Sequence, residues 1–241
     1  MVTRSSVRIG TAGWAIPRAV AGAFPANGVG LARYAARLTC AEINATFHRP
    51  VRPATLERWA ATVGDDFRFS VKAPRAITHD ARLSDAGGAL ANFLAAARAL
   101  GDRLGPLLVQ LPPSLAWDPA VAAPVFARMV GEGFAVACEP RHASWFTAEC
   151  DAWLAGLGVA RVAADPARCD GAERPGGWRR LTYVRLHGSP RAYWSSYDGP
   201  YLRALSERLE ADLAADRWCI FDNTASGAAA ANALELAARE Q

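Results

Sequence analysis

The chain has 241 residues, 51% of them hydrophobic, and carries a formal net charge of +4. This length suits one large α/β domain, and we expect a single domain over residues 1–241. No apolar run approaches the roughly 20 residues that span a bilayer, and the first ten residues lack the apolar stretch of a signal peptide. We therefore expect a cytoplasmic protein without a membrane partner.

The basic and cysteine residues narrow the function classes further. Lys72 is the only lysine among 27 lysines and arginines. The mild positive charge favours an anionic ligand, but no dense basic stripe indicates a nucleic-acid surface. The cysteines are odd in number and form no CxxC pair, so neither a disulfide framework nor a structural zinc site is expected. Cys138 and Cys219 lie in apolar runs, where we expect small buried hydrophobic residues.

Short β-branched or aromatic runs alternate with Ala-, Leu- and Arg-rich stretches, a pattern typical of βαβ units. The predicted strands are Val7–Thr11, Cys40–Thr46, Phe67–Lys72, Leu107–Leu111, Phe134–Glu139, Val159–Asp165, Thr182–His187 and Trp218–Asn223. The predicted helices are Val29–Leu38, Pro53–Val63, Asp85–Leu100, Pro119–Val130, Thr147–Leu157, Pro200–Ala214 and Gly227–Ala238.

The sixth connection differs from the others. Pro166–Trp178 is rich in Gly and Pro and should lack a full helix. Eight strands with right-handed crossovers predict an α/β fold of the (β/α)8 TIM-barrel type, with a short or missing sixth helix. An open doubly wound sheet is the alternative, although no GxGxxG follows the first strand.

Several predicted strands alternate polar and apolar residues, whereas parallel strands normally read as continuous hydrophobic runs. The apolar set must face the helices, so the polar set should point into the barrel. This set comprises Glu42, Asn44, Thr46, Arg68, Ser70, Lys72, Glu139, Tyr183, Arg185 and His187, with Arg141 following in phase. Most of them lie near the carboxyl ends of strands, where barrel active sites are built. The alternative interpretation is a structural salt-bridge network that plugs the barrel.

Histidines and aromatic residues are also placed at or just after strand ends. The histidines are His48, His79, His142 and His187, and the aromatic residues are Trp14, Phe47, Trp117, Trp145, Tyr193, Trp194 and Tyr197. Such aromatic residues suit a pocket for a ring or a sugar face, or else they pack loops over the barrel rim. From these groups we take His48, Trp14 and Trp145 as candidate substrate-binding residues.

The polar set suggests acid–base chemistry on an anion. Glu42 and Glu139 are the candidate acid–base carboxylates, and His187 is a plausible proton carrier. Lys72 could bind an anion, move a proton or form a Schiff base. Arg141 and Arg185 suit bidentate capture of a carboxylate or phosphate.

The turn that begins at Asn223 leads into the last predicted helix. Asn223, Thr224, Ser226 and Gly227 could hold a phosphate at the helix start, or simply cap the helix. Glu42, Glu139, His187 and Asp222 offer metal ligands, but no HxH or HExxH spacing supports them, and nearby Lys72 and Arg185 would repel a cation. We therefore expect neither a metal nor another cofactor.

A series of long motifs, in order along nearly the whole chain, resembles the domain of unknown function 72 (DUF72) family, also called YecE-like barrels. The motifs are IGTAGW (Ile9–Trp14), EINATFHR (Glu42–Arg49), FSVKAPRAITH (Phe69–His79), LGPLLVQLPPS (Leu104–Ser114), CEPRHASWF (Cys138–Phe146), YVRLHG (Tyr183–Gly188) and the FDNTASG turn. The resemblance implies a TIM-type barrel and no particular reaction. The family's polar motif positions fall here on Glu42, Asn44, Lys72, Gln110, Glu139, Arg141, Arg185 and His187. Of these, we also take Asn44 and Gln110 as candidate substrate-binding residues.

These patterns leave several functions open. The first is an enzyme that acts on a small anionic substrate, such as a phosphorylated or sugar-containing one, by acid–base chemistry. The second is a nucleic-acid-processing barrel, whose affinity should fall steeply with salt. The third is a non-catalytic ligand-binding module. A glycosidase is a narrower option, which requires a suitable gap between the carboxyl groups of Glu42 and Glu139.

Overall fold

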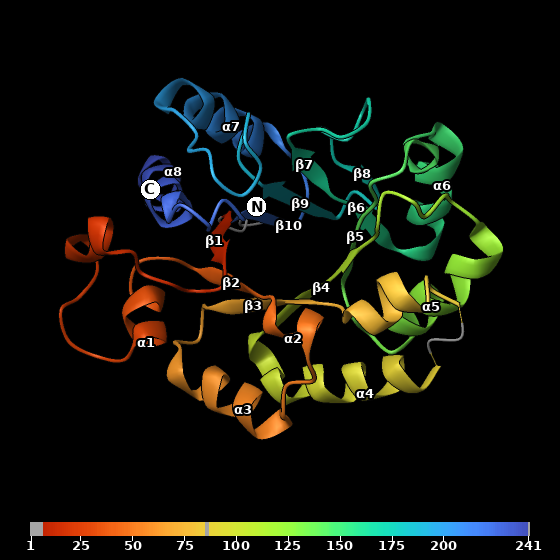
Figure 1. Ribbon diagram of the computed structural model, residues 1–241, viewed down its shortest axis with the longest axis horizontal. Helices are drawn as coiled ribbons and strands as arrows, with labels where there is room; N and C mark the ends of the chain where they lie inside the picture. The colour runs from red at the N-terminus through yellow and green to blue at the C-terminus, as the bar shows by residue number, and fades with distance from the viewer. Residues whose placement is uncertain (1–6, 85–86, 241) are drawn as a thin grey trace, which may run out of the picture.

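The computed structural model describes residues 7–84 and 87–240, so Asp85 and Ala86, at the start of the predicted helix Asp85–Leu100, lie outside the described residues. In the described part a mostly parallel sheet curls into a barrel surrounded by helices (Figure 1). The strands are β1 (Arg8–Ala12), β2 (Cys40–Ile43), β3 (Arg68–Lys72), β4 (Leu104–Gln110), β5 (Val136–Glu139), β6 (Val159–Arg161), β7 (Ala163–Asp165), β8 (Gly176–Gly177), β9 (Leu181–Leu186) and β10 (Asp216–Phe221).

The longer helices lie outside the barrel, and each follows a strand along the chain (Figure 1). They are α1 (Gly30–Ala35), α3 (Pro53–Thr62), α4 (Gly87–Ala97), α5 (Pro119–Gly131), α6 (Ala148–Leu157), α7 (Gly199–Ala211) and α8 (Ala228–Arg239). Short helical turns are η1 (Arg18–Ala23), α2 (Ala45–His48), η2 (Ala76–Asp80), η3 (Arg98–Arg103) and η4 (Ala143–Trp145). None of the described helices is both long and apolar enough to cross a bilayer.

One predicted strand brings the two sides of the sheet together. The sheet order is β7-β9-β10-β1-β2-β3-β4-β5-β6-β8. The predicted strand Val159–Asp165 is divided at Val162: β6 pairs with β5, and β7 pairs with β9. Because β6 and β7 are consecutive in the chain, the sheet becomes a nearly closed barrel. The predicted barrel architecture is thus confirmed, and the open doubly wound sheet is not what forms.

The sixth connection contains no helix, as predicted. Residues 166–178, all of them described, form turns and the short strand β8, which pairs antiparallel with β6. Arg161 stabilises this turn from the barrel side. Its guanidinium donates to the carboxylate of Asp151 at 2.7 and 2.9 Å and to the carbonyl oxygens of Gly171 and Arg174 at 3.2 Å each.

The second strand is shorter than predicted. β2 ends at Ile43, and Asn44 adopts helical backbone angles (φ −95°, ψ −13°) that begin α2. The Thr46 hydroxyl donates to the carbonyl oxygens of Ile43 and Lys72, at 3.1 and 2.7 Å, and so ties this turn to the end of β3. The prediction that Asn44 and Thr46 continue the inward-facing strand pattern was therefore wrong. Arg68 lies at the amino end of β3, far from the carboxyl ends of the strands, and donates to the backbone carbonyls of Asp65 and Phe67.

The floor of the barrel is apolar and closely packed. The indole of Trp218 is fully buried and stacks on Tyr183, with ring centroids 6.0 Å apart. Gly105 at the start of β4 leaves the space for this indole, because a Cβ there would lie 2.4 Å from the ring. Cys138 and Cys219 are fully buried and unpaired, as expected for small hydrophobic residues.

This contact predicts the effect of a single methyl group. Gly105→Ala should lower the free energy of unfolding by about 1–3 kcal/mol, because the indole must shift within a packed interior. Urea denaturation followed by tryptophan fluorescence measures the change. Gly64→Ala is the matched control, since nothing lies within 4 Å of a Cβ placed there. Equal stability of the Gly105→Ala and Gly64→Ala variants would contradict this account of the barrel floor.

Candidate active site

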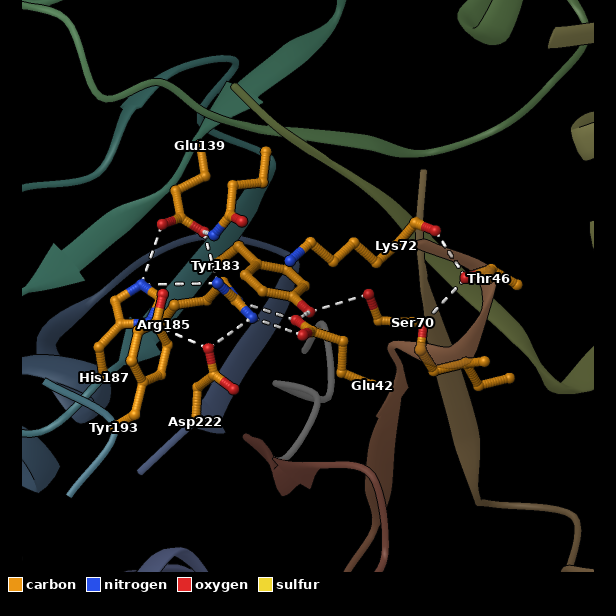
Figure 2. A network of polar contacts seen from close by, with 12 residues as sticks. Glu42, Thr46, Ser70, Lys72, Glu139, Tyr183, Arg185, His187, Tyr193 and Asp222 are labelled. Carbon is orange, nitrogen blue, oxygen red and sulfur yellow. Dashed lines mark hydrogen bonds and ion pairs between the residues drawn. The ribbon is translucent and has the colours of Figure 1, made fainter. Parts of the chain in front are cut away.

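Arg185 lies at the centre of a cluster of buried charged side chains at the carboxyl end of the barrel (Figure 2). Its Nη2 and Nε donate to Glu42 Oε1 and Oε2 at 2.6 and 2.9 Å. Its Nη1 donates to Glu139 Oε2 at 2.6 Å, and Nη2 also donates to Asp222 Oδ2 at 3.0 Å. The carboxylates come from β2, from β5 and from the residue that follows β10. Burying charges is costly unless they are paired, so this arrangement allows them to share the barrel interior.

Neutral polar groups complete the coordination of these carboxylates. The Tyr183 hydroxyl lies 2.9 Å from Glu42 Oε2 and 2.8 Å from Ser70 Oγ. Gln110 Nε2 donates to Glu139 Oε2 at 2.9 Å. Glu42 is fully buried, and both of its oxygens are engaged. Glu42 therefore holds Arg185 in place and is not exposed to solvent.

His187 bridges two of the carboxylates through both ring nitrogens. Nε2 lies 2.9 Å from Glu139 Oε1, and Nδ1 lies 3.0 Å from Asp222 Oδ2. Ionised carboxylates only accept hydrogen bonds, so the ring satisfies both contacts only as a doubly protonated imidazolium. Burial opposes this charge, but the Glu139 carboxylate and the hydrogen bonds to Asp222 and Glu139 outweigh it and raise the pKa of His187 above its ordinary value.

The two carboxylates beside His187 stay ionised for a matching reason. Burial alone would favour their protonated forms. Arg185 and His187 outweigh burial and hold the pKa of Glu139 well below its usual range, and the same two residues lower the pKa of Asp222. Glu139 is thus held as an anion, which does not suit it to be a resting proton donor. The imidazolium is the better candidate.

Arg141 and Tyr193 lie between this cluster and solvent. Arg141 Nη2 lies 3.2 Å from Glu139 Oε1 and 3.4 Å from the Tyr193 hydroxyl. The Tyr193 ring meets His187 edge-on, with centroids 5.6 Å apart, and 39% of the residue is exposed. Tyr193 also has a positive φ of 66°, which is uncommon for a residue with a side chain. These residues form the solvent side of the cluster.

Lys72 enters the cluster from the end of β3, on the side opposite His187 (Figure 2). Its Nζ lies 4.2 Å from the centroid of the Phe47 ring. It forms no ion pair with a carboxylate of the described residues. The residue is largely buried, with 9% of its surface exposed. Burial, followed by repulsion from Arg185, lowers the pKa of Lys72. The amine is therefore closer to losing its proton than an ordinary lysine.

Most of the polar residues predicted for the site do come together. Figure 2 shows Glu42, Lys72, Glu139, Arg185 and His187 converging at one end of the barrel. Gln110 and Arg141 contact the same cluster through Glu139. The catalytic and binding roles suggested for these residues stay predictions. The burial of Glu42 and Arg185 also agrees with the alternative interpretation of a structural network, which here forms the base of the site.

Two of the predicted binding residues, Trp145 and Asn223, are deeply buried in the protein. Trp145 is almost fully buried, and its Nε1 donates to the Leu115 carbonyl oxygen at 2.9 Å. Asn223 is fully buried, and its amide donates to Ser195 O and Asn232 Oδ1 at 2.9 and 3.0 Å. The substrate-binding roles predicted for Trp145 and Asn223 therefore stay predictions, without a contact to the cluster among the hydrogen bonds of these side chains. Hydrophobic packing and loop anchoring account for both side chains.

Three others lie near strand ends but outside the cluster. Trp14 packs edge-on against Trp59 and Phe69 in the layer between the barrel and its helices. His48 is exposed, and its ring contacts Phe47. Asn44 is half-buried, with an Oδ1 that has no hydrogen-bond partner in the described structure. A position after a strand end therefore does not by itself bring a side chain into the cluster, because the chain turns outward there.

The central guanidinium bears on one of the functions considered from sequence, the glycosidase. Glu42 and Glu139 bond to the same Arg185 group, which therefore occupies the space between the two carboxylates. A scissile glycosidic bond would have to lie there, so the arrangement argues against a glycosidase. Among the described residues, no three or more His, Cys, Asp or Glu side chains have the arrangement of a metal site.

The predicted site omitted Asp222, Tyr183 and Tyr193. Asp222 was considered only as a metal ligand, yet it continues the inward-facing alternation of Trp218 and Ile220 along β10 and could have been found that way. Tyr183 carried the same signal in β9. Tyr193 gave no such signal, because the loop that follows β9 places it beside His187.

Comparisons with known proteins agree with this barrel. The family described as "Protein of unknown function DUF72" matches residues 8–241. The UPF0759 protein YecE of Escherichia coli (strain K12) is 31% identical over 116 residues, which cover 48% of this chain and 43% of YecE, less than half of that relative's length.

Two solved structures are similar to the chain along nearly its whole length. A DUF72 family protein from Thermotoga maritima MSB8 aligns with a TM-score of 0.76 and 22% identity, over 98% of this chain and 99% of that chain. A DUF72 family protein from Enterococcus faecalis V583 aligns with a TM-score of 0.76 and 18% identity, over 95% and 94%. These likenesses show the fold, and the match over residues 8–241 shows the family: the chain belongs to the DUF72 family.

Proposed function

We propose that this protein is an enzyme that performs acid–base chemistry on a small anionic substrate at the carboxyl end of its barrel. The observation that carries the proposal is the ammonium of Lys72. It is the buried cation of the cluster that forms no ion pair with a carboxylate of residues 7–84 and 87–240. Glu42, Glu139 and Asp222 each bond to Arg185 instead. An incoming anion would therefore meet an ammonium that no carboxylate of these residues already holds in an ion pair.

Other cations act on the same region of the protein as Lys72. After burial, the charges that lower the pKa of His79 are those of Arg75, Lys72 and Arg141, in that order. With His187 protonated, the cluster carries one more positive than negative charge, counting Arg185, Lys72, Arg141 and His187 against three carboxylates. A carboxylate or phosphate group is the ligand chemistry that such a surplus favours.

His187 is the proposed proton donor. A basic oxygen of the substrate can take the Nε2 proton in place of Glu139 Oε1. Glu139 remains hydrogen-bonded in that event, because Arg141 Nη2 lies 3.2 Å from Oε1, and Gln110 and Arg185 donate to Oε2. Asp222 continues to accept from Nδ1, which fixes the orientation of the ring. This is the arrangement of a general acid held by two carboxylates.

The anion site can be tested before the substrate is known, with inorganic phosphate as the probe. Lys72→Met and Arg141→Gln should each weaken phosphate binding by about tenfold or more, because a charge-assisted hydrogen bond contributes about 1.5–3 kcal/mol. Isothermal titration calorimetry at about 0.1 M ionic strength, where the Debye length is about 10 Å, measures the affinity. Arg37→Gln is the charge-matched control, because Arg37 is exposed and lies just before β2, at the opposite end of the barrel.

The outcomes separate the proposal from a general charge effect. Affinity in the Arg37→Gln variant should stay within about twofold of the parent protein, since exposed charges farther away than a Debye length are screened. Absence of phosphate binding in the parent protein, or equal weakening by all three substitutions, would overturn the anion site.

For catalysis, we expect deuterium exchange from D₂O into members of a panel of carboxylates and phosphate esters, and its loss in His187→Phe. Tight retention of a compound without exchange or turnover would instead indicate a ligand-binding module.

A further inference from the structure

We infer that Lys72 acts as a nucleophile that forms a Schiff base with an aldehyde or ketone group of the substrate. This inference rests on the proposed function and narrows its substrate class to small carbonyl compounds that also carry an anionic group. The anionic group would bind near Arg141 and His187, both of which contact Glu139, and Lys72 would attack the carbonyl carbon of the same molecule.

The choice of residue is the first argument. Lys72 is the only lysine of this chain, which uses arginine at its 26 other basic positions. Arginine binds carboxylate and phosphate at least as well as lysine does, through a planar fork of donors. A primary amine that can lose its proton and attack a carbonyl carbon is what lysine offers and arginine does not. The single lysine lies at the carboxyl end of a barrel strand, where barrel enzymes place their catalytic groups.

The surroundings of the amine are the second argument. Nζ lies against the Phe47 ring, 4.2 Å from its centroid, and the backbone at Lys72 is fixed by the hydrogen bond from Thr46. The neighbouring carboxylates are occupied by Arg185, so none forms an ion pair with the ammonium in the described structure. Burial and the positive charge of Arg185 lower the pKa of Lys72, as expected for a desolvated amine beside another cation.

The covalent step balances without any further reagent. The ammonium of Lys72 first releases one proton, and the amine lone pair then forms a bond to the carbonyl carbon while the C=O π electrons move to oxygen. The oxygen takes up two protons, one from the nitrogen and one from the imidazolium of His187 or from solvent, and leaves as water. The products are a protonated imine and water. Together they contain the same atoms and the same charge as the reactants, an ammonium and a carbonyl group. His187 is reprotonated by the proton that Lys72 released.

The sole lysine makes a trapping experiment simple to interpret. The full-length protein is incubated with glyoxylate, a small anionic aldehyde, and sodium cyanoborohydride near pH 7, and peptide mass spectrometry locates the adduct. The α-amino group of the chain has a pKa of about 7.7–8.0, whereas an ordinary lysine has one of about 10.4, so an ordinary lysine would react later than the α-amino group. We expect the opposite order, with Lys72 labelled at least about tenfold faster than the α-amino group.

Two further measurements separate this inference from the proposed function. Lys72→Arg replaces the primary amine with a guanidinium, so it should yield no adduct at position 72. In the unsubstituted protein, saturating phosphate should slow labelling of Lys72 by about tenfold and leave labelling of the α-amino group unchanged, and this comparison needs no variant to fold.

Labelling confined to the α-amino group, in a protein that binds phosphate, would overturn the Schiff-base inference and leave the anion site standing. Labelling of Lys72 in a protein without phosphate affinity would support the nucleophile and overturn the anion site. If Lys72 is not labelled and the protein does not bind phosphate, the Schiff-base inference and the anion site are both overturned. Labelling of Lys72 at the same rate in urea-unfolded protein would also contradict the inference, because an activated amine requires the folded surroundings.

Discussion

Replacing Arg185 with leucine is expected to lower the free energy of unfolding by about 3–5 kcal/mol, because removing one partner leaves uncompensated charges in the interior. Arg185 is fully buried and forms ion pairs with Glu42, Glu139 and Asp222. Among the described residues, Arg185 is the one cation that forms ion pairs with all three carboxylates. Urea denaturation monitored by circular dichroism measures the loss.

A control and a partial rescue show whether the buried pairing is the cause. Arg174→Leu removes an arginine that is 78% exposed and pairs with Glu173, and it should change stability by no more than about 1 kcal/mol. Adding Glu42→Gln to Arg185→Leu removes one stranded charge and should recover part of the loss. An Arg185→Leu protein within about 1 kcal/mol of the parent would show that water reaches the cluster and solvates the carboxylates.

The dependence of stability on pH is expected to identify the charged form of His187. Its pKa is raised in the folded protein, so its contribution to stability is complete below the unfolded pKa of about 6.5 and is lost as the pH rises through the folded pKa. Glu139 and Asp222 have lowered pKa values, so their contributions are complete above about pH 4.5 and are lost as the pH falls. Stability should therefore be highest between about pH 4.5 and pH 6.5.

His187→Phe keeps a planar ring of similar size and removes both nitrogens. Near pH 5.5 it should cost about 1.5–3 kcal/mol for each of the two charge-assisted hydrogen bonds that are lost. The difference from the parent protein should shrink as the pH rises through the folded pKa of His187. Denaturation midpoints across this pH range measure the effect, with the exposed His48→Gln as the control. A difference that grows with pH would show that the ring is neutral in the folded protein.

The sequence patterns were sufficient for the architecture. Each predicted strand of the barrel is present, and the missing sixth helix follows from the Gly- and Pro-rich stretch 166–178. The boundaries shifted where local hydrogen bonds competed with the pattern, as at Asn44, where α2 replaces the end of the second strand. Period-two alternation identified the inward-facing Glu42, Glu139, Arg185 and His187 because the side chains of a strand must alternate between the helix layer and the barrel interior.

Residues in loops were predicted less well. Trp145, Asn223 and Trp14 follow strand ends, but their side chains pack into the protein or anchor neighbouring loops. Tyr193, which does reach the cluster, lies in the loop after β9 with a positive φ. Loop paths depend on which surfaces they meet, and no local periodicity reports that.

The amino-acid sequence by itself determined the barrel, its incomplete sixth unit and the polar face of its strands, because these follow from local periodicity and turn chemistry. Only the tertiary structure decided which charged side chains form ion pairs with one another and which do not. Arg185 forms ion pairs with three carboxylates, and protonated His187 bridges two of them. Lys72 forms no ion pair with a carboxylate among the described residues. These outcomes depend on distances between strands far apart in the chain and on the burial that sets the strength of each interaction.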